Sequence, residues 1–311
     1  MKHLAALFLP CCVVPATAQV RFDAHADYVA VNIEGKPFTT FYFAGAAPKP
    51  YLHPLTTAGG NRITRLYPME NVAGETHDHP HHRGLWFTHG DVNGLDFWAN
   101  EVAVHNPKRG IIVNSKVLSV KNGDSQGVIE SSCDWAGPGE VKLLAEHRTM
   151  TFYSSPDSRV IDFDVTFTAA TKVTFGDTKE GFFAIRLRDE LSELKGSGMM
   201  VNAEGKKGMG DVWGARSPWV DYSGDLEGKK IGVAIFDHPE NPKHPTFWHA
   251  RDYGLFAANA FGEHDFLKDK TKDGSLTLQP GRSLRFRYRV LIHNGDTEAA
   301  GIAKEYAKYA K

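Results

Sequence analysis

The sequence has little cysteine and, after its first residues, no long apolar run. Of its 311 residues only three are cysteines, and Cys11 and Cys12 lie in an N-terminal segment that we expect to be removed. The remaining thiol, Cys133, has no partner for an internal disulfide, so the fold must depend on its hydrophobic core. No later run reaches the ~20 apolar residues that a membrane-spanning helix needs. We therefore expect a soluble protein.

Charge of one sign is not in excess either. Lys and Arg number 36, against 37 Asp and Glu. This balance argues against nucleic acid and anionic membrane as main partners, and it suits a neutral small substrate or a modest polar ligand. The sequence also lacks a phosphate-cradling glycine loop, a Gly-x-Ser-x-Gly elbow, a Cys-x-x-Cys pair and any repeat of 20 to 50 residues.

The first 18 residues have the pattern of an export signal. Lys2 and His3 form a short basic start, residues 4–14 are apolar, and residues 16–18 (Ala-Thr-Ala) form a small-x-small cleavage site. We expect residues 1–18 to be a signal peptide, the mature chain to begin at Gln19, and the protein to be periplasmic or secreted.

The rest of the chain is typical of strands and tight turns. It is rich in glycine and aromatics, and alternating apolar and polar residues predict many strands. The strands are expected at 28–33, 38–43, 61–67, 85–87, 111–120, 127–135, 141–153, 159–168, 181–187, 231–237, 246–258 and 283–293. Only residues 297–311 show helical spacing, with Asp296 or Thr297 as the N-cap. The prediction is an all-β fold, in which residues 19–311 form one large antiparallel β-sandwich domain closed by a C-terminal helix.

Residues 77–89 carry an unusual concentration of imidazoles. Five of the fifteen histidines lie within these thirteen positions, at 77, 79, 81, 82 and 89. Histidine gains and loses protons near neutral pH and is the commonest metal ligand. Because burying many polar rings requires a partner for each polar atom, this stretch is better suited to a site than to a core.

Two kinds of chemistry fit this stretch. In the first, His79, His81 or His82 acts as a base while Arg83 holds an oxygen. In the second, His79 and His81 bind a divalent metal, although no third ligand stands at a standard spacing, so no cofactor is assigned. The plainer alternative is a polar loop whose imidazoles bond to backbone carbonyls.

A second cluster follows much later, at residues 244–253. His249 and Arg251 alternate on one face of a predicted strand, beside Asp252 and Tyr253. Aromatic rings pack on the apolar face of a sugar and charged groups bind its hydroxyls, so this is a common carbohydrate-binding combination. A solvated edge strand is the alternative.

Glu180 stands at the mouth of a predicted strand and could act as an acid to a histidine base, or could be an ordinary turn residue.

Several runs resemble a bacterial family of unknown function often labelled "methane oxygenase PmoA family". They are residues 78–87, 89–94, 96–98, 179–181, 219–224 and 244–257, so the likeness spans nearly the whole mature chain. A membrane methane monooxygenase subunit needs several apolar spans, so we do not adopt that activity. The resemblance implies a sugar-utilisation setting. More distantly, residues 60–63 followed by the histidine stretch resemble aldose epimerases, which implies a galactose mutarotase-like supersandwich with a histidine and a glutamate as base and acid.

Our leading hypothesis is an exported carbohydrate-processing enzyme (an epimerase, lyase or hydrolase) that acts on a sugar or keto-sugar by His/Glu acid-base chemistry. The predicted catalytic residues are His79, His81, His82, Glu180 and His249. The predicted substrate-binding residues are Arg83, Trp86, Arg251, Asp252 and Tyr253. The alternatives are a periplasmic carbohydrate-binding protein without catalysis and a His-ligated metal-dependent enzyme.

Overall fold

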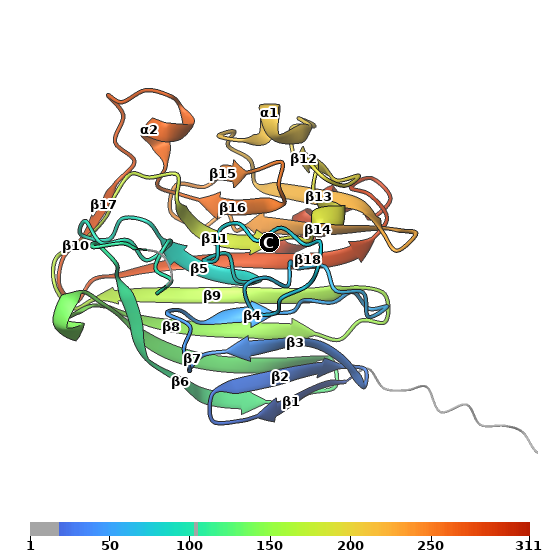
Figure 1. Cartoon of the computed structure of the whole chain (residues 1–311), viewed down its shortest axis with the longest axis horizontal. Coiled ribbons are helices and arrows are strands. Elements are labelled where there is room, and N and C mark those ends of the chain that lie inside the picture. Colours follow the sequence, from blue (N-terminus) through green and yellow to red (C-terminus); the bar gives the residue numbers. More distant parts are fainter. Residues whose placement is uncertain (1–18, 103–104) are drawn as a thin grey trace, which may run out of the picture.

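The computed structural model describes residues 19–102 and 105–311, so the expected signal peptide lies outside the described residues. Within them, two eight-stranded antiparallel sheets and a small two-stranded sheet make up the fold (Figure 1). A C-terminal helix follows the last strand. The expected all-β class, with large antiparallel sheets and a C-terminal helix, is confirmed.

The first sheet has the order β1 (Val20–Ala24), β2 (Tyr28–Ile33), β3 (Lys36–Tyr42), β4 (Tyr51–His53), β5 (Leu85–His89), β11 (Gly181–Arg186), β16 (Leu255–Asn259) and β15 (Phe247–Ala250). The second has the order β12 (Met199–Asn202), β13 (Trp219–Leu226), β14 (Lys229–Asp237), β18 (Ser283–Asn294), β9 (Arg159–Ala169), β8 (Lys142–Tyr153), β7 (Gln126–Ala136) and β6 (Ile111–Lys121). The small sheet pairs β10 (Val173–Phe175) with β17 (Leu276–Leu278). The helices are α1 (Gly208–Val212), α2 (Glu263–Phe266), α3 (Ile302–Tyr309) and the short 3-10 turns Pro138–Glu140 and Asp189–Leu191.

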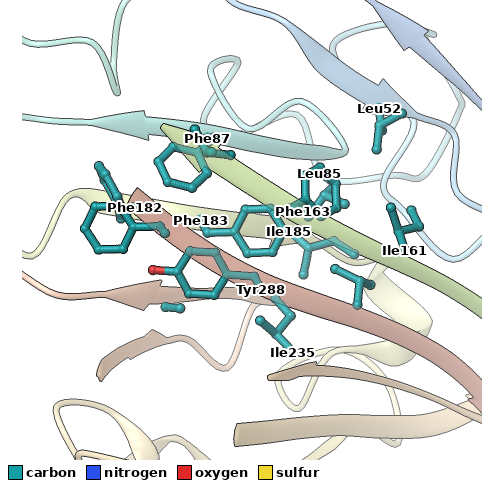
Figure 2. Packing of buried hydrophobic residues seen from close by; sticks show 14 of the residues in the cluster. Leu52, Leu85, Phe87, Ile161, Phe163, Phe182, Phe183, Ile185, Ile235 and Tyr288 are labelled. Atoms are coloured by element: carbon teal, nitrogen blue, oxygen red, sulfur yellow. The ribbon is translucent and has the colours of Figure 1, made fainter. Parts of the chain in front are cut away.

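The main hydrophobic core lies where the two large sheets face each other. Phe183 of β11 stacks on Tyr288 of β18 with ring centroids 4.8 Å apart, and it meets Phe163 of β9 at the same distance. Figure 2 shows these rings together with aliphatic side chains from both sheets. Such interlocked aromatic packing fixes the position of one sheet on the other.

Most predicted strands are present, but two local predictions are wrong. Residues 61–67 form only isolated bridges, because the buried Arg65 side chain turns to polar partners in the next loop. Helix α3 begins at Ile302, with Gly301 as its N-cap. Thr297 does not cap it, since its hydroxyl donates to the buried Asp221 carboxylate at 2.6 Å.

The outer face of the first sheet carries a row of residues that the site uses. Across β4, β5, β11, β16 and β15, the register aligns Tyr51, Trp86, Ala184, Ala257 and His249. The first four belong to a hydrophobic cluster separate from the main core. The two alanines leave space above the sheet that larger rings from the loops can occupy.

Candidate functional site

A cavity of about 430 Å³ lies over this row. Four segments far apart in the sequence line it. They are the histidine loop (residues 77–84), the loop after β5, the residues just before β11, and β15 with the turn that follows it. The lining residues are His79, His81, His82, Asp96, Trp98, Ala99, Lys179, Glu180, His249, Arg251 and Tyr253. The structure thus brings all five predicted catalytic residues to one hollow, together with two of the five predicted binding residues.

Stacked rings form one wall of the cavity. The ring of His79 is nearly parallel to those of His82 and Tyr253, with centroids 4.7 Å and 5.3 Å away, and the centroids of His82 and Tyr253 are 6.4 Å apart. His82 in turn stacks on Trp86 at 5.2 Å. Trp98 meets His82 edge-on at 5.7 Å. This arrangement gives the cavity a rigid aromatic surface of the kind that packs against a sugar ring.

Beneath the histidine loop, two arginines share one carboxylate. Arg65 and Arg186, whose side chains are fully buried, both bind Oδ1 of Asp78, and the Arg186 contact is 2.8 Å. Burial alone would raise the pKa of Asp78. The hydrogen bond from His79 and the charges of Arg186 and Arg65 outweigh that effect and hold the pKa of this carboxyl well below its usual range. Asp78 is therefore a fixed negative charge.

Asp78 also orients His79. Nδ1 of His79 lies 3.0 Å from Oδ2 of Asp78. Because an ionised carboxylate can only accept a hydrogen bond, Nδ1 carries a proton, and in the neutral imidazole Nε2 is then the acceptor. The backbone of His79 has a φ of 43°, in the left-handed region that few side chains adopt. Such strain is often retained where a side chain must point in one direction.

The neighbouring His82 has the opposite tautomer. Arg186 approaches its Nδ1 at 3.2 Å, and a guanidinium can only donate, so Nδ1 accepts and Nε2 carries the proton. Burial, together with the charges of His81 and Arg186, lowers the pKa of His82 well below its usual value. His82 is thus suited to donate a hydrogen bond to an oxygen, and less suited to the role of base.

His81 and His249 are neutral imidazoles. Burial, with Lys49 and His79 nearby, lowers the pKa of His81 to about 3. Burial lowers the pKa of His249 to about 4, against an opposing effect of the Glu180 charge. Nδ1 of each is buried with no hydrogen-bond partner among the described residues. Buried polar atoms are seldom left unpaired, so these nitrogens are candidates to meet a ligand or water.

Glu180 and Lys179 also line the cavity. Nζ of Lys179 lies 2.6 Å from Oε1 of Glu180, and both side chains are more than a third exposed. The charge of Glu180 acts to raise the pKa of both His249 and Tyr253, so Glu180 lies near both rings. Glu180 therefore lines the same hollow as the stacked rings.

Two charged residues near the cavity were missed from the sequence. Asp96 lies in a segment interpreted as a turn, and it accepts hydrogen bonds from the backbone N–H groups of Trp98 and Ala99 at 2.8 and 2.9 Å. Burial raises its pKa. Lys49, in a segment interpreted as a proline-rich loop, is buried and donates to the Trp98 carbonyl at 3.0 Å; burial lowers its pKa to about 7. The residues around Asp96 and Lys49 in the sequence are typical of turns and loops, and no motif near them indicates a functional site.

Three predicted binding residues lie outside the cavity lining. The guanidinium of Arg83 forms two hydrogen bonds with Glu101, at 2.7 and 2.9 Å, and lies over the Tyr51 ring. Trp86 is 1% exposed beneath His82. Asp252 is in the turn after β15 but does not line the hollow. Arg83 and Trp86 therefore support the site from below and do not form its surface.

In the described part of the chain, no group of three or more His, Cys, Asp or Glu side chains is arranged to hold a metal ion. His79 and His81, the two predicted ligands, meet edge-on with ring centroids 5.6 Å apart. Nδ1 of His79 is already engaged by Asp78.

Within the described residues, no helix is long and apolar enough to cross a membrane.

Comparison with protein families gives a match that spans most of the chain. A family model described as a family of unknown function (DUF6807) matches residues 28–307. It does not carry the methane oxygenase label, which stays a resemblance. No curated protein matches the chain.

Similar solved structures are distant. The GH36 α-galactosidase AgaA from Geobacillus stearothermophilus is 10% identical, with a TM-score of 0.42 over 89% of this chain and 40% of that one. The heparan sulfate lyase HepC from Pedobacter heparinus is 8% identical, with a TM-score of 0.38 over 95% and 38%. A galactose mutarotase-like protein from Lactobacillus casei ATCC 334 is 9% identical, with a TM-score of 0.37 over 88% and 100%. The chain thus spans about two fifths of the first two proteins.

Proposed function

This chain belongs to the DUF6807 family of unknown function, and we propose that it is an exported carbohydrate-processing enzyme that moves protons by His/Glu chemistry. In this proposal His79 is the base and Glu180 is the acid. The substrate is a sugar or a keto-sugar, and the reaction is an epimerisation, an elimination or a hydrolysis.

The observation that carries the proposal is the pairing of His79 with Asp78 at the edge of an aromatic cavity. Asp78 fixes the His79 tautomer so that Nε2 can accept a proton. A sugar hydroxyl, or a C–H bond made acidic by a neighbouring carbonyl, would supply that proton. Glu180 borders the same hollow and, in its protonated form, would deliver a proton to the oxygen that gains electrons.

Other cavity residues would then bind and orient the substrate. The Nε2–H of His82 is a fixed donor that suits a sugar oxygen. The rings of Tyr253 and Trp98 offer flat surfaces for the apolar face of a pyranose. Holding the reacting atoms near both proton-transfer groups lowers the entropic part of the barrier.

A second candidate function is carbohydrate binding without turnover. It is favoured by the pKa values of His81 and His249, which burial lowers to about 3 and about 4. Such imidazoles do not exchange protons near neutral pH, so they serve as hydrogen-bonding groups. In a binding protein His79 would do the same, and its replacement would change affinity alone.

The test is a substrate screen with variants of the proposed acid and base. The purified protein is incubated with keto-sugars, aldoses and disaccharides, and products are followed by NMR. We expect turnover that falls roughly 10²- to 10⁴-fold in His79→Asn and Glu180→Gln, which is the usual contribution of general acid-base groups.

A matched control is available in the same loop. His77 stacks on Tyr67 with ring centroids 4.5 Å apart and does not line the cavity. His77→Asn should therefore keep full turnover. If sugars bind but no product forms with any substrate, the binding-protein candidate replaces the enzyme. Equal loss in His77→Asn and His79→Asn would show that the loop is needed only for folding.

Export is a separate part of the proposal. The basic start, apolar run and Ala-Thr-Ala site of residues 1–18 support it. Mass spectrometry of the protein from a periplasmic or culture-medium fraction should show an N-terminus at Gln19. An uncleaved N-terminus in the cytoplasmic fraction would contradict export.

A further inference from the structure

Arg251 is a cationic residue of the cavity that has no partner of its own. It is partly buried in the turn after β15, and its Nε atom is buried without a hydrogen-bond partner in the described part of the chain. No ion pair links it to a carboxylate within residues 19–102 and 105–311. Its guanidinium lies 5.6 Å from the centre of the Tyr253 ring.

The other arginines of this region are different. Arg65 and Arg186 share the carboxylate of Asp78, and Arg83 forms its two bonds with Glu101. Because a guanidinium carries a permanent charge and five donors, leaving one partly buried without an acceptor is costly. An unpaired arginine at the wall of a cavity is therefore a candidate to bind an anion from the ligand.

The balance of charge around the hollow points the same way. Asp78 is one carboxylate set against two buried arginines. Asp96 also lines the hollow, where burial raises the pKa of its carboxyl. Lys179 offsets Glu180. Arg251 adds a positive charge that no ion pair within the described residues balances, and a low-dielectric cavity strengthens its attraction for an anion.

We propose that the substrate is an anionic sugar whose negative group binds Arg251. This rests on the proposed function and narrows its substrate class. It differs from the neutral substrate that the overall charge balance suggested, since net charge describes the whole surface and not one cavity. A carboxylate matches the guanidinium fork with two parallel hydrogen bonds, and a sulfate ester offers the same anionic oxygens.

The experiment compares matched pairs of sugars by isothermal titration calorimetry. The pairs are galactose with galacturonate, glucose with glucuronate and mannose with mannuronate, and galactose 6-sulfate is added to separate a carboxylate from a sulfate. We expect at least one acid to bind roughly tenfold or more tightly than its neutral partner, which is the scale of one charge-assisted hydrogen bond. The preference should weaken as salt increases.

The variants assign the preference to one side chain. Arg251→Gln should reduce the affinity for the acid to that for the neutral sugar, and Arg251→Lys should restore part of it. Arg21→Gln is a matched control, because Arg21 lies in β1 at the other end of the same sheet. Circular dichroism of each variant checks that it is folded.

The outcomes separate this proposal from the function on which it rests. Equal affinity within every pair, no binding of any acid, or an acid preference that survives in Arg251→Gln would overturn the anionic substrate. Turnover of neutral sugars alone would overturn it while leaving the enzyme intact. Tight binding of an acid without product would support the anion site and contradict catalysis.

Discussion

Nδ1 of His79 lies 3.0 Å from the carboxylate of Asp78, and that carboxylate also binds two fully buried arginines. The group that orients the proposed base is therefore also the group that neutralises the charge beneath it. Orientation of the base and stability of the loop are linked through a single side chain.

The first prediction concerns the stability that Asp78 provides. Asp78→Asn removes the one carboxylate that Arg65 and Arg186 share. Because two buried guanidinium groups then lack a counter-charge, we expect the free energy of unfolding to fall by about 3 kcal/mol. Guanidinium chloride denaturation at pH 7 measures this value.

A matched control for Asp78 is Asp164, whose partner Arg285 is on the surface with 56% of its side chain exposed. Asp164→Asn should change the free energy of unfolding by less than about 1 kcal/mol, as is usual for exposed ion pairs. Equal effects of the two substitutions would mean that the Asp78 network contributes no more than a surface pair.

The second prediction concerns pH. Burial lowers the pKa of His249 to about 4, below the ~6.5 of an unfolded histidine. Between these values the unfolded chain binds a proton that the folded chain does not, so the stability from this residue is complete above pH ~6.5 and is lost as the pH falls toward 4. Thermal unfolding from pH 7 to 4.5 should show this loss, and His249→Gln should show a smaller slope, by up to about 1.4 kcal/mol per pH unit.

His25 provides the comparison for this measurement. Its side chain is 42% exposed, on the strand-connecting turn beside β1. His25→Gln should keep the wild-type pH dependence of the melting temperature. A slope in His249→Gln equal to that of the wild type would show that His249 does not stay neutral in the folded protein.

The third prediction concerns ligand affinity. The Tyr253 ring stacks on His79 at 5.3 Å and lines the cavity. Tyr253→Ala removes this flat surface, so we expect sugar binding to weaken by about 2 kcal/mol, or roughly 30-fold. Tyr253→Phe keeps the ring and should bind nearly as the wild type does.

A distant stacked pair controls for the loss of any surface tyrosine. Tyr28 stacks on His25 with centroids 4.3 Å apart and is outside the cavity. Tyr28→Ala should leave affinity unchanged in the same calorimetric titration. If Tyr253→Ala binds as tightly as the wild type, the stacked wall is not the sugar surface.

The fourth prediction concerns metal. Since Nδ1 of His79 is engaged by Asp78 and the described residues hold no cluster of three ligands, we expect weak metal binding. After incubation with zinc or manganese and gel filtration, elemental analysis should find less than about 0.1 equivalent. A stoichiometric ion, lost in His81→Asn, would favour the metal-dependent alternative.

The sequence predicted the parts of the fold that depend on local patterns. Alternation along residues 162–167 predicted a strand with one buried face, and β9 has that pattern. The strands predicted at 28–33 and 38–43 form the hairpin of β2 and β3, although β3 begins earlier, at Lys36, so the connecting turn is only Glu34 and Gly35. In contrast, Arg65 looked like a polar position on a strand, because nothing near it shows that Asp78 and Arg186 will meet it in space.

The same limit applies to the site. The clustered histidines and the pair His249 and Arg251 were visible as unusual polar runs, and the structure places His79, His81 and His82 around one cavity with that pair. Lys49 was not visible, because its bond to the Trp98 carbonyl joins residues 49 positions apart. Asp96 was not visible, because its bonds to the N–H groups of Trp98 and Ala99 are those of an ordinary turn. The ion pair of Arg83 with Glu101 likewise depends on a partner 18 positions later in a loop.

The strand order of the first sheet, in which β5 pairs with β11 and β11 with β16, has a consequence for assembly. His82 of the histidine loop contacts Arg186 of β11, which is 104 positions later in the sequence. The turn that carries Arg251 comes later still. Contacts between such remote segments form late in folding, after shorter loops have closed. The hollow should therefore exist only in chains that have completed the sheet. A molecule that occupies it would raise the melting temperature by mass action and would report on complete folding.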